Sequence, residues 1–205
     1  MAGLERLLVF LKAPRVGTVK TRLADTLGRE AATAAYRTLV ETLLREMDSL
    51  DGVELRYAPD DAASEIQPWR RPSWHLASQG SGDLGDRLIR AFAEHFADGA
   101  RKVVVIGADC PDAAPDDVRN AWSALDHHDL VVGPAHDGGY WLIGLTSPRP
   151  ELFRDLAWST EHVLSGTLNR AREAGLRIAQ LRTLTDIDVE PEWRAWRLRV
   201  SDRNH

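Results

Sequence analysis

Residues 103–112 read VVVIGADCPD, and this stretch decides the fold class. An apolar, β-branched run forms a buried strand that ends at Gly107 and then presents Asp109 and Asp112. Similar short runs alternate along the chain with segments of helical period, which predicts a mostly parallel sheet covered on both faces. We therefore expect a three-layer α/β/α, Rossmann-like domain with a mixed, mostly parallel sheet of about seven strands.

The remaining elements follow from the same periodicities. We expect strands at Leu7–Leu11, Val53–Ala58, Trp74–Ser78, Lys102–Gly107, Leu130–Pro134, Tyr140–Leu145 and Arg177–Thr183. Helices are expected over 32–47, 84–96 and 115–125, from Ser159 or Thr160 to 174, and over 193–200. The segment 60–72 contains two prolines and mixed charge, which predicts a loop.

Length and composition limit the class of protein. With 205 residues, of which 43% are hydrophobic, the chain suits one domain spanning 1–205. A net charge of -5 argues against a nucleic acid or an anionic membrane as partner. We find neither a membrane-spanning run nor a signal peptide and expect a cytoplasmic protein, for which a homodimer is one option. Cys110 is the only cysteine, so a bound metal would be held by oxygen ligands.

The segment LKAPRVGTVKTRL, residues 11–23, directly follows the first expected strand. It carries Lys12, Arg15, Lys20 and Arg22 around Gly17. Four cations on one loop are suited to binding a polyphosphate, and a glycine allows the backbone to come close to the phosphates. The spacing is not that of a P-loop, and a solvated basic loop is the alternative.

Two aspartate motifs are candidate metal ligands. Asp109 lies at the carboxyl edge of its strand, where open α/β sheets bind ligands, and can hold Mg²⁺ or Mn²⁺. Late in the chain, TDIDVE offers Asp186 and Asp188, of which Asp188 is the second metal candidate. Whether Asp186 or Asp112 also binds metal stays open, because Asp112 can equally serve a turn or a helix cap.

Three further motifs fit a second substrate or a nucleoside. HDGGYWLIGL, residues 136–145, is either a hairpin signal or a wall for a small acceptor. QGSGDLGDRL, residues 79–88, leads into a helix N-terminus, where free N–H groups favour anions or bind a base. WST, residues 158–160, supplies hydroxyls that either cap a helix or hold an acceptor.

Taken in order, KAPRVGTVKTRL, GDLGDRL, GADCPD, GPAHDGGYWLIGL, WST and DID resemble the DUF2064 family of bacterial transferases, in the glycosyltransferase-A superfamily. The chain is more distantly similar to 2-phospho-lactate and molybdenum cofactor guanylyltransferases. The resemblance implies a nucleotide-diphospho-sugar transferase fold. One departure is that Val189, Glu190, Pro191, Glu192 and Trp193 follow Asp188 where those guanylyltransferases continue with Thr-Pro-Glu-Asp-Leu.

The resemblance also implies residue roles. Metal would lie on Asp109 and Asp188, and Lys20, Arg22 and Asp109 would be catalytic. The nucleotide would be held by Leu11, Lys12, Arg15, Gly17, Lys20, Arg22, Gly82, Asp83, Leu84 and Gly85. The acceptor would be held by Asp137, Gly138, Gly139, Tyr140, Ser159 and Thr160.

These observations favour a Mg²⁺- or Mn²⁺-dependent nucleotidyltransferase. It would join an NTP, with GTP or CTP favoured, to a small phosphate- or phosphonate-bearing acceptor and release pyrophosphate. The alternative is a glycosyltransferase with a nucleotide-sugar donor, in which Asp137 serves as base. A nucleotide-binding module without turnover is the third hypothesis.

Overall fold

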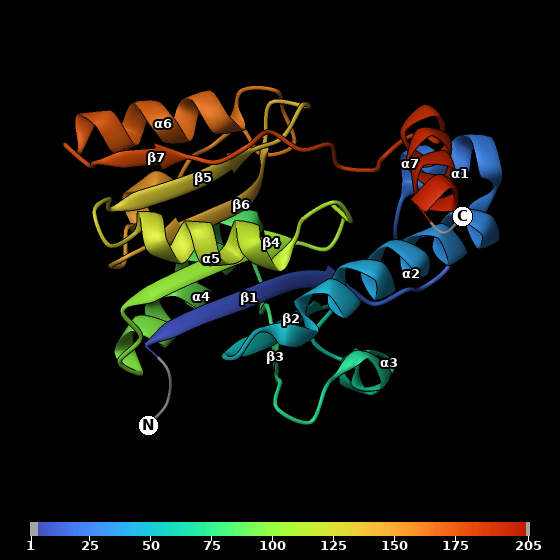
Figure 1. The fold of residues 1–205 in the computed structure, drawn as a ribbon, viewed down its shortest axis with the longest axis horizontal. Coiled ribbons are helices and arrows are strands. Elements are labelled where there is room, and N and C mark those ends of the chain that lie inside the picture. Colours follow the sequence, from blue (N-terminus) through green and yellow to red (C-terminus); the bar gives the residue numbers. More distant parts are fainter. Residues whose placement is uncertain (1–3, 204–205) are drawn as a thin grey trace.

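A seven-stranded sheet forms the centre of the molecule. The computed structural model describes residues 4–203. The strands are β1 (Glu5–Lys12), β2 (Val53–Ala58), β3 (His75–Ser78), β4 (Lys102–Gly107), β5 (Leu130–Pro134), β6 (Tyr140–Leu145) and β7 (Ile178–Gln180). Their order is β3-β2-β1-β4-β6-β5-β7, and β6 alone among them runs antiparallel to its neighbours (Figure 1). The predicted mixed, mostly parallel sheet is confirmed.

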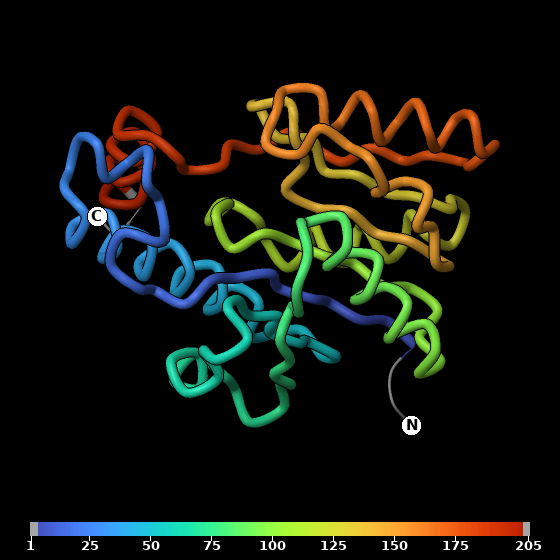
Figure 2. The backbone as a smooth tube through the Cα atoms, turned by 180° about the vertical axis from the view of Figure 1, so that it is seen from behind, coloured from blue at the N-terminus to red at the C-terminus, as the bar shows by residue number. Residues whose placement is uncertain are grey.

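Helices cover both faces of the sheet, because the central strands β1, β4, β5 and β6 bury side chains on both sides. On one face, α2 (Arg29–Glu46), α3 (Ala63–Ile66) and α5 (Pro115–Ala124) enclose one core cluster. On the other, α4 (Leu84–Ala97) and α6 (Val163–Glu173) enclose a second. Seen from behind, α4 lies in front of the sheet (Figure 2). The result is the expected three-layer α/β/α arrangement.

A smaller group of helices lies beyond one edge of these layers. The helices α1 (Thr21–Leu27) and α7 (Glu190–Arg203) pack beside the first half of α2 (Figure 1). Trp196 and Ile187 are buried against Leu39, and Trp193 packs on both this cluster and the one around Leu23. Packing of the last helix on the first therefore brings the segment before α7 next to the segment before α1.

Several elements differ from the sequence-based prediction. The strand expected at 177–183 pairs regularly only over β7, although Leu181 and Leu184 still donate to the carbonyls of Val132 and Pro134. The expected loop at 60–72 contains α3 and a 3₁₀ turn at Gln67–Trp69, because Ile66 and Trp69 are buried. Further 3₁₀ turns occur at Met47–Ser49 and Pro150–Leu152.

The helix predicted from Ser159 or Thr160 begins later, at Val163. The Thr160 hydroxyl donates to the carbonyl of Ala157 and accepts from the N–H of His162, so it closes the turn before the helix. Gly175, with φ of 68°, follows the helix end as expected. In residues 4–203 no helix is both long enough and apolar enough to cross a bilayer.

Candidate functional site

A cleft of about 710 Å³ opens at the edge where β1 and β4 end and β6 begins. This is the edge at which open α/β sheets bind ligands. Of the eighteen residues to which the resemblance assigns a role, twelve line it, namely Leu11, Lys12, Lys20, Arg22, Leu84, Asp109, Asp137, Gly139, Tyr140, Ser159, Thr160 and Asp188. Six others do not line it, namely Arg15, Gly17, Gly82, Asp83, Gly85 and Gly138.

Lys20 joins the two aspartates proposed as metal ligands. Its Nζ lies 2.9 Å from Asp109 Oδ2 and 2.7 Å from Asp188 Oδ1. The Lys20 side chain is 3% exposed, whereas those of Asp109 and Asp188 are 45% and 40% exposed. We call these three residues the junction. One buried cation thus draws together two carboxylates that still face the cleft.

Backbone hydrogen bonds place the two aspartates beside each other. The N–H of Ile187 donates to the carbonyl of Asp109, which fastens the late segment to the end of β4. The N–H groups of Asp188 and Val189 both donate to Glu192 Oε2, at 2.7 and 3.0 Å. Glu192 therefore closes the turn here, in a sequence that departs from the guanylyltransferase pattern.

Lys20 adopts an unusual backbone conformation to reach the junction. Its φ and ψ are 49° and 47°, in the left-handed region that a residue with a Cβ rarely adopts, and α1 begins directly after it. Burial alone would lower the pKa of Lys20, but the charges and hydrogen bonds of Asp109 and Asp188 raise it overall. The ammonium therefore stays charged, and the strained conformation is held by its two ion pairs.

Asp186 lies in the same cleft but outside the junction. Within residues 4–203, its carboxylate makes no hydrogen bond or salt bridge. Burial, together with the charges of Asp109 and Asp137, raises the pKa of Asp186 to about 7. This side of the cleft is therefore a region of negative potential.

The cationic loop divides into residues that face the cleft and one that does not. Arg15 donates to Glu65 and Asp61, with Nη2 at 2.6 and 3.0 Å from their carboxylates, and so turns toward α3. Lys12 and Arg22 line the cleft. The Tyr36 hydroxyl accepts from the Lys12 N–H and donates to the Lys12 carbonyl, which fixes the end of β1. Three cations rather than four therefore face the cleft.

The glycine loop before α4 serves mainly to begin the helix. Asp83 Oδ1 accepts from the Asp86 N–H, and Asp86 Oδ2 accepts from the Asp83 N–H, which is a capping box. Leu84 lines the cleft and is 42% exposed. At Gly85, a Cβ would lie 2.6 Å from the carbonyl oxygen of Phe153 and 2.9 Å from Trp158 Nε1. Gly85 thus allows Trp158 to reach the cleft wall.

The loop at 136–139 forms the wall on the β6 side. Asp137 Oδ1 accepts from the Gly139 N–H at 2.9 Å, and the other carboxylate oxygen has no hydrogen-bond partner in the described part of the chain. Gly138, with φ of 88°, packs directly on the backbone of Glu161, where a Cβ would collide with it. The Leu164 N–H donates to the Gly138 carbonyl, so this loop is fastened to α6.

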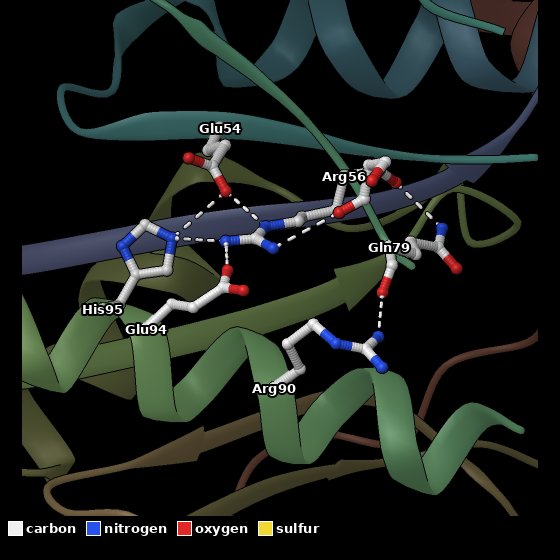
Figure 3. A network of polar contacts seen from close by, with 7 residues as sticks. Glu54, Arg56, Gln79, Arg90, Glu94 and His95 are labelled. Atoms are coloured by element: carbon white, nitrogen blue, oxygen red, sulfur yellow. Dashed lines mark hydrogen bonds and ion pairs between the residues drawn. The ribbon is translucent and has the colours of Figure 1, made fainter. Parts of the chain in front are cut away.

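Sequence reasoning missed Gln79, which lies buried in the cleft floor. Its Nε2 donates to the carbonyls of Leu11 and Arg56, and Arg90 donates to its carbonyl. These contacts belong to a larger buried network that also includes Glu54, Glu94 and His95 (Figure 3). The position of Gln79 directly after β3, at the same sheet edge as Lys12, is the sequence signal that could have indicated its place in the cleft.

Tyr36, Trp158 and Glu161 also line the cleft and were not among the candidates. The helical period over 32–47 places Tyr36 on the buried face of the expected helix and does not indicate that its hydroxyl reaches the cleft. Asp112 is not a cleft residue. Its carboxylate accepts from Arg199 Nη2 at 2.6 Å, whereas Asp117 serves the start of α5 by accepting from the Ala114 N–H. Cys110 is buried, and burial raises the pKa of its thiol.

The junction fits a divalent cation that enters with phosphate. Among the described residues, no group of three or more His, Cys, Asp or Glu side chains is arranged to hold a metal. Mg²⁺ is commonly bound by one or two carboxylates, with phosphate oxygens and waters as its other ligands. Asp109 and Asp188 already share one cation and present oxygens to the cleft. The donor set therefore suits a metal–phosphate complex.

Comparison with known proteins agrees with this fold. Residues 43–160 match a family described as an uncharacterized protein conserved in bacteria, DUF2064. No curated protein matches the sequence. A crystal structure from Desulfovibrio desulfuricans G20, described as a candidate nucleotide-diphospho-sugar transferase, is 35% identical. It superposes with a TM-score of 0.85 over 91% of this chain and 83% of that one.

Two more distant structures share the fold. A CMP:2-keto-3-deoxy-manno-octonic acid synthetase in complex with CTP is 10% identical, with a TM-score of 0.60 over 97% of this chain and 99% of that one. A manganese complex of Rv0371C from Mycobacterium tuberculosis H37Rv is 15% identical, with a TM-score of 0.53 over 93% and 96%. The nucleotide-diphospho-sugar transferase fold expected from the resemblance is thus confirmed.

Proposed function

This chain belongs to the DUF2064 family, and from that premise we propose that it is a metal-dependent nucleotidyltransferase. The similar structures support a transferase that acts on nucleotides. The donor would be an NTP, with GTP or CTP favoured, and one structural neighbour of this fold binds CTP. The acceptor would be a small molecule, and pyrophosphate would leave.

The observation that carries this proposal is the junction at the cleft. Lys20, Asp109 and Asp188 combine a buried ammonium with two carboxylates that face a cavity large enough for a nucleotide. Lys12 and Arg22 line the same end. A divalent cation on Asp109 and Asp188 would neutralise charge on the leaving phosphates. That a structural neighbour was solved with manganese supports the same choice of metal.

The chain's own residues would position the donor. As the phosphates enter, Lys20 would release its carboxylates and pair with a phosphate oxygen, a short movement for a flexible side chain. Arg22 and Lys12 would hold the remaining phosphate charge. The acceptor oxygen then forms a bond to the α-phosphorus, and the α–β bridging bond breaks with its electron pair leaving on pyrophosphate. Positioning and charge neutralisation supply the acceleration.

Product analysis tests the proposal directly. The protein is incubated with Mg²⁺ or Mn²⁺, each of the four common NTPs, and a pool of small metabolites as acceptors. We expect pyrophosphate release that requires metal and is lost in Asp109→Asn. Absence of pyrophosphate with every NTP would contradict nucleotidyl transfer.

Glycosyl transfer from a nucleotide sugar is the second candidate, and a specific observation favours it. Arg15 is bound by Glu65 and Asp61, so three cations rather than four remain for phosphate. A diphosphate needs fewer cations than a triphosphate. Release of a nucleoside diphosphate from nucleotide sugars in the same assay would select this reaction. Nucleotide affinity that is unchanged by chelation or by Asp109→Ala would instead support a binding module without turnover.

A further inference from the structure

The cleft is divided by charge along the sheet edge. Its basic lining residues, counted over residues 4–203, are Lys12, Lys20 and Arg22, which come from the end of β1, the residue before α1 and the first turn of α1. The opposite end, formed by the loop before β6 and the turn before α6, carries Asp137 and Glu161, while Asp186, from the segment before α7, adds a carboxylate near both Asp109 and Asp137. No basic side chain lines that end in the described part of the chain. All three cations therefore lie at the nucleotide end, together with Asp109 and Asp188, whereas the acceptor end carries carboxylates without a basic side chain.

Neither Asp137 nor Asp186 forms a salt bridge within residues 4–203, whereas Glu161 lies 3.8 Å from His162 Nε2. Asp137 accepts one backbone N–H and has no salt bridge among the described residues. Asp186 makes no hydrogen bond or salt bridge within 4–203. Because like charges in a partly buried site repel, a phosphate or carboxylate placed here would face an unfavourable potential. An acceptor with donor groups would instead find unbonded acceptor oxygens.

The same end of the cleft has an aromatic wall. Tyr140 and Trp158 line it, and the Trp158 Nε1 is buried against Gly85 without a hydrogen-bond partner in residues 4–203. Aromatic faces carry partial negative charge and attract ammonium groups and the C–H faces of polar rings. The Ser159 hydroxyl is exposed there and makes no hydrogen bond in the described chain, whereas the Thr160 hydroxyl is committed to its turn.

From these three observations we propose that the acceptor is a neutral or amine-bearing polyhydroxyl compound, such as a sugar or an amino sugar, and that its hydroxyl is the nucleophile. This inference rests on the proposed function and differs from the phosphate-bearing acceptor that the sequence favours. The acceptor stacks on Trp158 and Tyr140, and its hydroxyls or ammonium donate to Asp137 and Asp186. An anionic acceptor is rejected by charge.

The chemical step balances with this acceptor. The hydroxyl oxygen bonds to the α-phosphorus of the NTP, or to the anomeric carbon if the donor is a nucleotide sugar. The bond to the leaving phosphate oxygen breaks, and its electron pair stays with pyrophosphate or the nucleoside diphosphate. The hydroxyl proton passes to the unbonded oxygen of Asp137. No oxidant or further reactant is needed.

Matched probes test the charge preference without knowledge of the natural acceptor. Glucose, glucosamine and glucose 6-phosphate share one ring and differ in charge. Their binding is measured by saturation-transfer NMR on the protein alone and on the protein with Mg²⁺ and a non-hydrolysable nucleotide. We expect glucosamine and glucose to bind, and glucose 6-phosphate to bind at least about tenfold more weakly.

Variants locate the effect at the acceptor end. Asp137→Asn should remove the preference for glucosamine over glucose, and Asp137→Lys should restore binding of glucose 6-phosphate. Asp155→Asn, an exposed carboxylate outside the cleft, should leave the ranking unchanged. Equal or tighter binding of glucose 6-phosphate by the wild type, or binding of none of the three probes in either state, would overturn the inference.

Nucleotide affinity measured by calorimetry on the same samples separates the two proposals. If the nucleotide binds with metal but the probe ranking is reversed, only the acceptor inference fails. If no nucleotide binds while glucosamine still outranks glucose 6-phosphate, the proposed function fails and the charge preference of the pocket stands.

Discussion

Two buried cations in this molecule sit between carboxylates, yet their surroundings differ. Lys20, 3% exposed, pairs with Asp109 and Asp188, and Arg56, 5% exposed, pairs with Glu54 and Glu94. Both satisfy the rule that a buried charge needs a partner. Arg56, Glu54 and Glu94, which we call the Arg56 cluster, connect β2 with α4 (Figure 3). The junction instead lines the cleft.

The two clusters differ in how much of the hydrogen-bonding capacity of their carboxylates remains open to the cleft. The Arg56 guanidinium also donates to the carbonyl of Ser78 and lies 3.4 Å from His95 Nε2, and Glu54 lies 3.1 Å from the same nitrogen. Glu54 and Arg56 are thus buried against each other, and Glu94, although 47% exposed, does not line the cleft. At the junction, both carboxylates are nearly half exposed, and Asp186 nearby makes no hydrogen bond or salt bridge with any residue of the described range 4–203. A charge cluster thus indicates a site only when part of its bonding capacity faces a cavity.

The largest expected effect is on stability and concerns the Arg56 cluster. Arg56→Met leaves Glu54 without its buried partner and should lower the free energy of unfolding by about 3–5 kcal/mol. Urea denaturation measures this. Turnover per folded molecule should stay near the wild-type value, since Arg56 does not line the cleft. If Arg56→Met were as stable as the wild type but had lost turnover, the structural role that we assign to the Arg56 cluster would be wrong.

The next effect is on turnover and concerns the junction. Lys20→Met should lower kcat by about 10²–10³-fold, as removal of one charge-stabilising donor does. Stability should change by only about 1 kcal/mol, because Asp109 and Asp188 remain solvated from the cleft.

Lys102 offers a matched control for that variant. Its Nζ also binds two carboxylates, Glu5 at 3.1 Å and Asp126 at 2.7 Å, but at the start of β4 and away from the cleft. Lys102→Met should leave kcat unchanged. If both lysine variants lose turnover equally, the loss reflects general charge effects and not the junction.

A smaller effect concerns pH. Burial alone would raise the pKa of Glu54, but His95 and Arg56 lower it below its ordinary value of 4.5. A lowered folded pKa gives stability that is present above the unfolded pKa and is lost as pH falls through the folded pKa. Glu54→Gln should therefore cost about 1.5–3 kcal/mol at pH 7, with the difference from wild type shrinking below pH 4. Urea titrations at several pH values measure it, and a constant difference would show that charge is not involved.

Much of the architecture was predictable, because the strands are local apolar runs. The run at 103–106 and its glycine end led to β4 and to Asp109 at the correct edge of the sheet. The antiparallel order of β6 next to β4 was not predictable, since it depends on long-range pairing. The strand expected at 177–183 is longer than β7. The chain beyond β7, toward Leu184, still donates hydrogen bonds to β5 but does not pair with it regularly.

The sequence predicted which residues belong to the site, but not which of them pair with one another. The resemblance to the family assigns Lys20 and Asp188 to one site, but their ion pair was not predictable, because it depends on α7 packing beside α1. Arg15 was grouped with the phosphate cations because it is near them in sequence, whereas α3 presents Glu65 to it. Gln79 opens the motif at 79–88, but only its place directly after β3 reveals that its side chain lies in the cleft floor.

Manganese binding measured by electron paramagnetic resonance tests the central claim most directly. The ammonium of Lys20 occupies the space between Asp109 and Asp188, so free Mn²⁺ should bind the wild type weakly and tighten when a nucleotide is added. Lys20→Gln should bind free Mn²⁺ about tenfold more tightly and lose the tightening by nucleotide. Asp188→Asn should bind Mn²⁺ more weakly than the wild type, both without and with nucleotide. Mn²⁺ affinity that is the same in wild type, Lys20→Gln and Asp188→Asn would contradict the account.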